Sequence, residues 1–211
     1  MPRVHVSSHP LVAHHVLTLR DPGTRPAEFR RTIGRITRLL AVEATVNVST
    51  GEVRVTTPLG EASGRCIADR IAIVPILRAG LGMADGLLDM IPDAEVWHIG
   101  VSRDEVTLAP HEYYTKLPKA TSASLAIVVD PMLATGGSAV RTCEMLRAAG
   151  VPRILFLAII AAPEGIARLS AAMPDITIHV AAVDEGLNAS GFIIPGLGDA
   201  GDRQFGTVAT S

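Results

Sequence analysis

The sequence predicts an α/β protein whose mainly parallel sheet is flanked by helices, with a β-arm before the sheet and a C-terminal hood after it. Apolar runs typical of buried strands alternate with helix patterns from residue 71 to residue 183. The chain has 211 residues and 48% hydrophobic content, enough for one substantial core. We therefore expect a single domain, 1–211, comprising an N-terminal helix and arm (1–67), an α/β core (68–183) and a hood (184–211).

The N-terminal part contains two recognisable patterns. From Pro26 to Ala44, apolar side chains recur every three or four positions, which predicts an amphipathic helix. From Glu52 to Ile67, polar and apolar residues alternate around Pro58-Leu59-Gly60, as in a hairpin or arm. Neither segment carries a chemical signature, so both are expected to serve in packing or in dimer contacts.

The core pattern is strand followed by helix, repeated. Strands are expected at residues 71–77, 95–101, 125–130, 154–161 and 176–183. Helices are expected from the Arg78-Ala79-Gly80 turn to about Met90, from the turn after Asp130 to about Gly150, and over 163–172, with an irregular segment from the second strand through Pro118. This alternation predicts that ligands bind at the carboxyl ends of the parallel strands.

Charge and hydropathy exclude several function classes. A net charge of −2 and a pI near 6.4 give no reason to expect broad binding to nucleic acid or membranes. The first residues lack the apolar core of a signal peptide, and no later segment approaches the ~18 uncharged apolar residues of a membrane span. We therefore expect a cytoplasmic protein.

The cysteines and the N-terminal histidines predict no metal centre. Cys66 and Cys143 are the only cysteines and are far apart in sequence, so we expect two buried, reduced thiols. Four histidines fall in the first fifteen residues, but their spacing fits no zinc pattern. Packing or surface roles are expected for these four, His5, His9, His14 and His15.

The segment from Leu125 to Val140 predicts a phosphate site. A β-branched run ends at Asp130, and the turn Thr135-Gly136-Gly137-Ser138 then leads into a helix. Its backbone N–H groups and hydroxyls could hold a phosphate at the positive end of that helix. Two other phosphate motifs fail: no Gly-Lys pair exists for a nucleoside-triphosphatase loop, and the GxGxxG match at 196–201 leaves too little chain for a βαβ unit.

The strand, the acid and the Thr-Gly-Gly turn resemble the phosphoribosyl-diphosphate signature of type I phosphoribosyltransferases. The resemblance extends to the uracil branch of that family through five further or overlapping segments: VPILRAGLGM (74–83), HEYYTKLP (111–118), VVDPMLATGGS (128–138), IAAPEG (160–165) and GFIIPGLGDAGDRQFGT (191–207). Many members carry two adjacent acids at the strand end, whereas here Asp130 is followed by Pro131. Asp130 is then the single carboxylate for the ribose hydroxyls.

The resemblance implies transfer of a phosphoribosyl group from 5-phospho-α-D-ribose 1-diphosphate (PRPP) to uracil, giving UMP and diphosphate in pyrimidine salvage. Arg78, Asp130 and Asp199 are expected to act in catalysis, and Arg78 and Arg103 to clamp the diphosphate. By residue type alone, each arginine could equally be a solvated side chain, and Asp199 a turn carboxylate. The expected PRPP contacts also include the whole turn: Pro131, Met132, Leu133, Ala134, Thr135, Gly136, Gly137 and Ser138.

Base recognition is assigned by the resemblance to the hood. Uracil is expected against the backbone of Ile193, Gly198 and Ala200, beside Asp199, because fixed backbone donors and acceptors discriminate uracil from cytosine. Tyr113, Tyr114 and Lys116 could be packing residues; we interpret their segment as a mobile loop that closes over the donor sugar.

The same resemblance implies Mg²⁺ held mainly through the substrate, with no dedicated protein cluster. It further implies GTP as an activator in parts of the family, and a homodimer or higher homo-oligomer. Two alternatives stay open: an RNA-binding regulator on the same fold, which the charge disfavours, and an enzyme of the same class that uses a purine or orotate.

Overall fold

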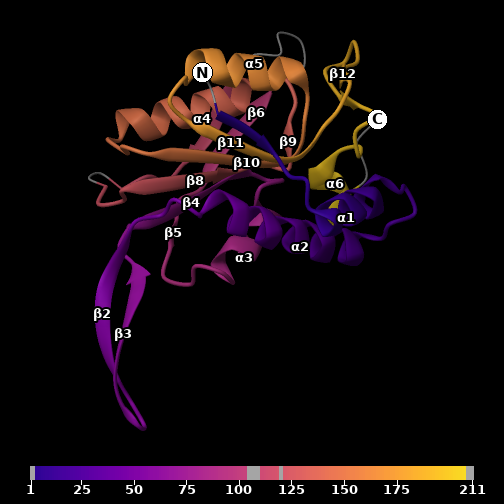
Figure 1. Cartoon of the computed structure of the whole chain (residues 1–211). Helices are drawn as coiled ribbons and strands as arrows, with labels where there is room; N and C mark the ends of the chain where they lie inside the picture. The colour runs from indigo at the N-terminus through magenta and orange to yellow at the C-terminus, as the bar shows by residue number, and fades with distance from the viewer. Residues whose placement is uncertain (1–2, 104–109, 119–120, 208–211) are drawn as a thin grey trace.

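The computed structural model describes residues 3–103, 110–118 and 121–207, and it confirms the predicted α/β class with a mostly parallel central sheet (Figure 1). The sheet order is β1-β11-β10-β8-β4-β6-β7, with β5 beside β4 and β9 beside β10. Only the β6–β7 pairing in this sheet is antiparallel. The strands of this sheet are β1 (Arg3–Val6), β4 (Ile71–Leu77), β5 (Glu95–Val96), β6 (Ile99–Arg103), β7 (Pro110–Thr115), β8 (Leu125–Val129), β9 (Met132–Leu133), β10 (Ile154–Ala161) and β11 (Thr177–Val183).

Helices cover both faces of the sheet. Figure 1 shows one set below the sheet and the other above it. The lower set is α1 (Pro10–Arg20), α2 (Pro26–Ala44) and α3 (Leu81–Leu88), and the upper set is α4 (Gly137–Ala148) and α5 (Pro163–Ala172). Among the described residues, no helix is both long and apolar enough to cross a membrane.

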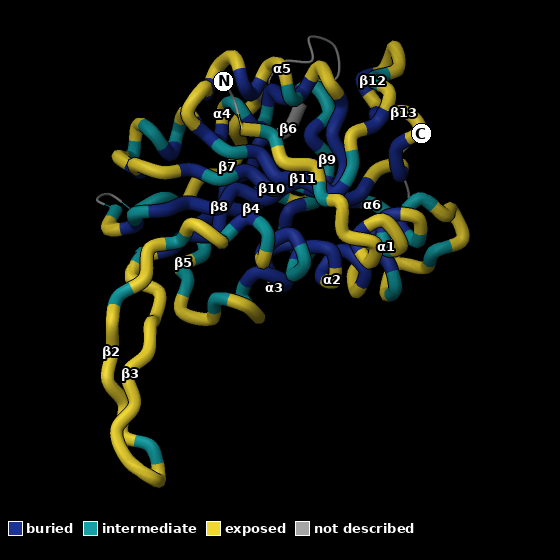
Figure 2. The backbone as a smooth tube through the Cα atoms, in the orientation of Figure 1, coloured by how far each residue is buried: buried dark blue, intermediate teal, exposed yellow. Residues whose placement is uncertain are grey.

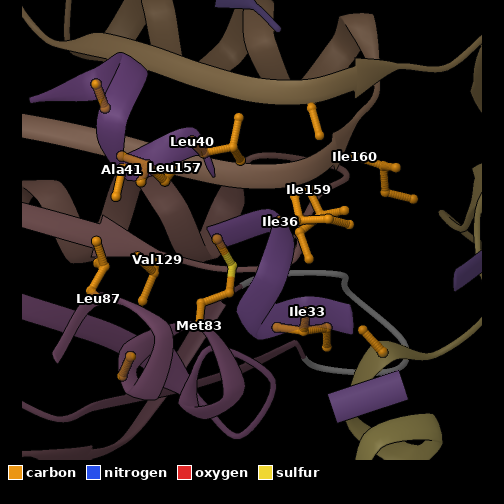
Figure 3. Packing of buried hydrophobic residues seen from close by; sticks show 14 of the residues in the cluster. Ile33, Ile36, Leu40, Ala41, Met83, Leu87, Val129, Leu157, Ile159 and Ile160 are labelled. Atoms are coloured by element: carbon orange, nitrogen blue, oxygen red, sulfur yellow. The ribbon is translucent and has the colours of Figure 1, made fainter. Parts of the chain in front are cut away.

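Two hydrophobic clusters, one on each face, hold these layers together. In β4, Ile71 and Ile73 belong to the cluster between the sheet and α2, while Ala72, Val74 and Ile76 belong to the cluster between the sheet and α4. This is the two-residue alternation of a strand buried on both faces. Figure 3 shows how Ile36 and Leu40 of α2 and Met83 and Leu87 of α3 meet the strand side chains of Val129, Leu157 and Ile159.

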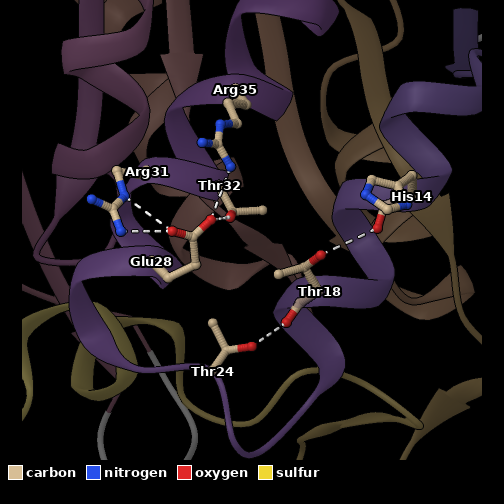
Figure 4. Close-up of polar contacts among 7 residues, drawn as sticks. All are labelled: His14, Thr18, Thr24, Glu28, Arg31, Thr32 and Arg35. Carbon is tan, nitrogen blue, oxygen red and sulfur yellow. Dashed lines mark hydrogen bonds and ion pairs between the residues drawn. The ribbon is translucent and has the colours of Figure 1, made fainter.

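The joint between α1 and α2 is fixed by polar contacts. The Thr24 hydroxyl donates to the carbonyl of Thr18 at 2.6 Å, near the end of α1 (Figure 4).

In the first turn of α2, Glu28 accepts from Arg31 at 2.7 Å and from Arg35 at 2.9 Å. A carboxylate at a helix N-terminus is favourable, because it faces the positive end of the helix dipole.

The arm is a hairpin of β2 (Thr50–Thr57) and β3 (Gly60–Ile67), as predicted, and it projects away from the body. Figure 2 shows it exposed along most of its length. Cys66 lies on β3 and is exposed, so the expectation that both thiols are buried is wrong for it, because no other described element packs over this part of the hairpin. Cys143 on α4 is buried, and burial raises the pKa of its thiol to about 12.

Several other expectations need correction. β1 and α1 were not predicted, because four residues and a weakly amphipathic helix leave little periodic signal. The strand expected at 95–101 is two strands separated near Trp97, and β7 lies within a segment expected to be irregular. The N-terminal histidines have local roles: His9 caps α1 by accepting from the Leu11 amide, and His5 stacks on His179.

The hood follows β11. It contains the short pair β12 (Gly186–Leu187) and β13 (Ile193–Ile194), and the helix α6 (Ala200–Phe205). Figure 1 shows α6 beside α1, at the end of the sheet where the strands finish. The tail is therefore an ordered cap, as the sequence predicts, and it lies across the edge at which a phosphate site is expected.

Candidate active site

The centre of the site is the turn between β8 and α4. The strand β8 is fully buried, and this holds the position of Asp130, the residue that follows the strand. Gly136 has φ 76°, and a Cβ at this position would lie 2.9 Å from the Gly165 carbonyl oxygen, so the turn needs glycine here. Because α4 begins at Gly137, the amides of its first turn have no helical carbonyl partner. They are therefore available to an anion.

A second glycine supports the turn from behind. Gly165 lies in α5, and a Cβ there would be 2.3 Å from the carbonyl oxygen of Ala134 and 2.6 Å from that of Leu133. The Leu133 carbonyl also accepts from the Ala162 amide at 2.9 Å. Gly165 lies in the IAAPEG segment, and the sequence alone did not predict this supporting role. A glycine two residues after a helix-starting proline was the available signal.

The turn and the hood line one pocket of about 270 Å³. Among the residues predicted for PRPP, Asp130, positions 132–138 and Asp199 line it, and Ala200, predicted for uracil, lines it from the hood. Three predicted residues do not line this pocket, although each is next in sequence to a residue that does: Pro131, Ile193 and Gly198. Phe192 and Gly191 of the hood also line this pocket, although neither was predicted as a site residue from the sequence.

A second pocket of about 320 Å³ adjoins the first and contains Arg78. The two pockets share Ala79, Asp130, Ser138 and Asp199, so they form one continuous site. The Arg78 side chain is 57% exposed and pairs with Asp202 of α6 at 3.1 Å. The hydrogen bond from Thr207, together with Arg78, holds the pKa of the Asp202 carboxyl below its usual value.

The two central carboxylates repel each other. Withdrawal from water and the nearby Asp199 raise the pKa of Asp130 to about 7, against a weak hydrogen bond from the Met132 amide at 3.3 Å. Asp199 caps α6 by accepting from the Asp202 amide at 2.8 Å. It is thus a turn carboxylate that also faces the pocket. This position is compatible with both roles considered for Asp199 from the sequence, a catalytic role and that of a turn carboxylate.

β7 supplies Tyr113 to the second pocket. Gly100 pairs with Tyr114 and Val101 with Glu112, so Tyr113 is the extra residue of a β-bulge. Its hydroxyl lies 3.4 Å from the Leu77 carbonyl, and a Cβ at Gly100 would meet its ring at 2.6 Å. Tyr114 and Lys116 are exposed and do not line the two pockets. The Arg103 side chain lies outside the described part of the structure, so its predicted role stays a prediction.

Electrostatics favours a cation near the two carboxylates, because a divalent ion would stabilise the charged form of Asp130, whose pKa is raised chiefly by withdrawal from water and further by Asp199. Within the described ranges, no group of three or more histidine, cysteine, aspartate or glutamate side chains is placed to hold a metal. Two carboxylates facing a phosphate-binding turn fit an ion that is bound mostly by its substrate.

Comparison with known proteins identifies the family. The family model described as uracil phosphoribosyltransferase matches residues 6–207. The chain belongs to the uracil phosphoribosyltransferase family. Curated relatives of that name are 51% identical in Roseiflexus castenholzii, over 98% of this chain and 100% of the relative, and 56% identical in Dictyoglomus thermophilum, over 96% and 98%. Membership makes the chain a glycosyltransferase of the pentosyl class.

Solved structures share the fold of this chain. An Aquifex aeolicus protein has a TM-score of 0.93 at 36% identity, and the match covers 99% of this chain and 100% of that one. Adenine phosphoribosyltransferase from Trypanosoma brucei, solved with AMP, pyrophosphate and ribose-5-phosphate, has a TM-score of 0.56 at 12% identity, over 90% and 88% of the two chains. The second match shows the shared type I fold alone.

Proposed function

We propose that this chain, acting as one unit over residues 1–211, transfers the phosphoribosyl group of PRPP to N1 of uracil and releases UMP and diphosphate. The observation that carries the proposal is the continuous site in which an anion-binding turn, one strand-end carboxylate and the hood converge. Strong sequence identity to relatives named for this activity supports the choice of uracil as the base.

Each part of the donor has a partner of suitable chemistry. The amides and hydroxyls at 134–138 bind the 5′-phosphate, and Asp130 accepts from the ribose 2′- and 3′-hydroxyls. Arg78, and Arg103 from the next strand end, bind the diphosphate with charge-assisted bonds. Pro131 and Met132 complete the turn, and Asp199 faces the sugar from the hood.

The reaction needs no protein nucleophile. The bond from C1′ to the diphosphate oxygen breaks, and its electron pair leaves with diphosphate. Uracil N1 bonds to C1′, and the N1 proton passes to water. The residues contribute by holding the two reactants in line and by binding the departing diphosphate. Bound Mg²⁺ would neutralise charge on the diphosphate, and Asp130 and Asp199 are the described side chains best placed to approach it.

Uracil lies in the hood, against the backbone of Ile193, Gly198 and Ala200, in this proposal. Fixed N–H and C=O groups pair with its carbonyl oxygens and ring N–H, an arrangement that cytosine cannot match at N3 and its exocyclic amine. Tyr113, Tyr114 and Lys116 form the segment that closes over the donor sugar. The bulge that sets Tyr113 facing Leu77 supports this role for the first of them.

The decisive experiment measures initial rates for the purified chain with PRPP, Mg²⁺ and, in turn, uracil, cytosine, orotate and hypoxanthine, each with and without GTP. We expect UMP from uracil and no comparable product from the other bases. Activity with another base but not with uracil would refute the substrate assignment. A higher rate with GTP would establish the activation found in parts of the family, and omission of Mg²⁺ should abolish turnover.

We also propose a homodimer or higher homo-oligomer in which the arm contacts another subunit. The support is the hairpin itself: Val53, Val55, Leu59 and Ile67 are exposed apolar side chains on a segment that the body leaves uncovered. Light scattering of the wild type and of a Val55→Lys variant tests this, with a smaller assembly expected for the variant. A cytoplasmic location stays a prediction.

A further inference from the structure

The hood is fastened to the C-terminal end of α1 by two arginines. Arg20, the last residue of α1, donates to both carboxylate oxygens of Asp184, at 2.8 and 2.5 Å. The Asp184 side chain is 3% exposed, and its amide donates to the Ala161 carbonyl of β10 at 2.9 Å. The carboxylate is therefore fixed to the sheet, and Arg20 is fixed to the carboxylate.

The same two side chains also hold the backbone of Gly196. Its amide donates to Asp184 at 2.9 Å, and its carbonyl accepts from Arg20 at 2.8 Å. The backbone amide and carbonyl of Gly196 are thus both bound by the ion pair of Arg20 and Asp184. Gly196 has φ 65°, and a Cβ there would lie 2.2 Å from the Ile193 carbonyl oxygen. The chain therefore turns sharply at this position, two residues before Gly198.

Arg203 of α6 binds the other side of the same loop. Its guanidinium donates to the Leu197 carbonyl at 2.7 Å, to the Leu19 carbonyl, and to the Asp21 carbonyl at 2.5 Å. Leu19 and Asp21 are at the end of α1, where unpaired carbonyls and the helix dipole favour a cation. The guanidinium also stacks over Phe29 of α2, 4.5 Å from the ring centroid.

We propose that Arg20 and Arg203 are positioning residues for base recognition, which set the backbone at 196–198 in the orientation that reads uracil. The inference rests on the proposed function, because it assumes that the base binds against this part of the hood. Neither arginine lines the pocket that contains Asp130 and Ala200. They act through the loop, and α1 thereby becomes part of the apparatus for selecting the base.

The pKa of Asp184 supports a persistent ion pair with Arg20 rather than a solvent-exposed surface contact. Burial would raise the pKa of the Asp184 carboxyl, but the hydrogen bonds from Arg20 and the Gly196 amide outweigh it and keep the pKa below its usual value. Asp184 is therefore charged at neutral pH, and its buried carboxylate is stabilised by the positive charge of Arg20. A lysine at position 20 would keep the charge but could not bind both carboxylate oxygens and the Gly196 carbonyl with one planar group.

The test compares Arg20→Lys, Arg203→Lys and Asp184→Asn with a matched control. Asp69 is 6% exposed and pairs with Arg153 at 3.0 Å, and Arg153 also donates to the Asn47 carbonyl. The carboxylate of this second ion pair is buried to a similar degree, although Arg153 is more exposed than Arg20, and its residues line neither site pocket. Arg153→Lys should therefore change stability without changing base binding. The measurements are KM for uracil, KM for PRPP, kcat, the midpoint of thermal unfolding, and UMP binding by calorimetry.

We expect KM for uracil to rise about tenfold in Arg20→Lys and in Arg203→Lys, with KM for PRPP within twofold of wild type and both KM values unchanged in Arg153→Lys. If all three lysine variants lose thermal stability yet keep the wild-type KM for uracil, the arginines are merely structural and the inference is overturned. If one hood variant does not fold, the other variant and Asp184→Asn decide. A wild-type chain that makes no UMP from uracil would instead refute the proposed function on which the inference rests.

Discussion

The phosphate turn and the hood face the same pocket but are built in different ways. The turn consists of consecutive residues between β8 and α4, and its shape depends on glycines and on backbone contacts with the nearby start of α5. The hood is held by side chains from distant parts of the chain: Arg20 of α1 binds Asp184, and Gln204 of α6 donates to Ala79. A site of this kind combines a local motif with a tertiary assembly, and substitutions should affect the two differently.

The largest effect should come from the carboxylate at the centre of the turn. Asp130→Asn removes a charged acceptor from two ribose hydroxyls, and each such bond is worth about 1.5–3 kcal/mol. We therefore expect kcat/KM for PRPP to fall roughly 100-fold or more. Asp89→Asn, which removes a carboxylate that pairs with Arg38 at the surface, is the control and should keep the wild-type rate. Wild-type kinetics for Asp130→Asn would refute its role.

The same residue should give a pH signature in stability. Asp130 has a pKa of about 7 in the folded protein and about 3.8 ordinarily, so between these values the folded state binds the proton more tightly than the unfolded state. Its contribution is therefore fully present below about pH 4 and is lost as pH rises through about 7. Urea unfolding at several pH values should show this decline in wild type and a flatter curve in Asp130→Asn. Identical curves would contradict the raised pKa.

The next effect tests the support beneath the turn. Gly165→Ala places a methyl group against the Ala134 and Leu133 carbonyls, and overpacking of this kind typically costs 1–3 kcal/mol. We expect kcat/KM for PRPP to fall about tenfold, with KM for uracil nearly unchanged. Gly64→Ala on the arm, where nothing lies within 4 Å of the added Cβ, provides the control. An equal rise in both KM values would show that the turn and the hood are not independent.

A smaller change should come from the contact between α6 and the β4–α3 turn. Gln204 is fully buried, its amide nitrogen donates to the Ala79 carbonyl at 2.7 Å, and its side-chain oxygen has no partner among the described residues. Gln204→Met keeps the volume and loses one hydrogen bond, so unfolding free energy should fall by about 1 kcal/mol. A loss above about 3 kcal/mol would show that the hood depends on this one contact far more than its geometry implies.

The smallest effect is expected at Tyr113. Its hydroxyl lies 3.4 Å from the Leu77 carbonyl, a long contact, whereas its ring packs on Gly100. Tyr113→Phe should change kcat by less than about threefold, and Tyr113→Ala should lower it more, because the ring is lost. Steady-state rates at saturating PRPP and uracil measure both. A large loss in Tyr113→Phe would assign the hydroxyl a direct role in the reaction.

The sequence predicted the elements with strong periodicity and failed where periodicity was weak. The boundaries of α2, β4, β10 and α5 agree with the predicted ranges, because these elements bury a continuous stripe or run of apolar side chains. β1 and β7 were missed: each is an edge strand with exposed side chains, and its position depends on pairing with a neighbour. Cys66 was misplaced for the same reason, since burial depends on what packs over a strand.

The local chemistry of the site was therefore contained in the sequence: an apolar strand, one acid and a glycine turn predict a phosphate site, because all three are contiguous and glycine permits the backbone conformation of the turn. What only the tertiary structure decided is how that turn meets the hood. Withdrawal from water, together with the charge of Asp199 from the hood, raises the pKa of Asp130, and Arg20 binds Gly196, 176 positions later. Contacts between residues so far apart depend on how the layers pack, which no local pattern specifies.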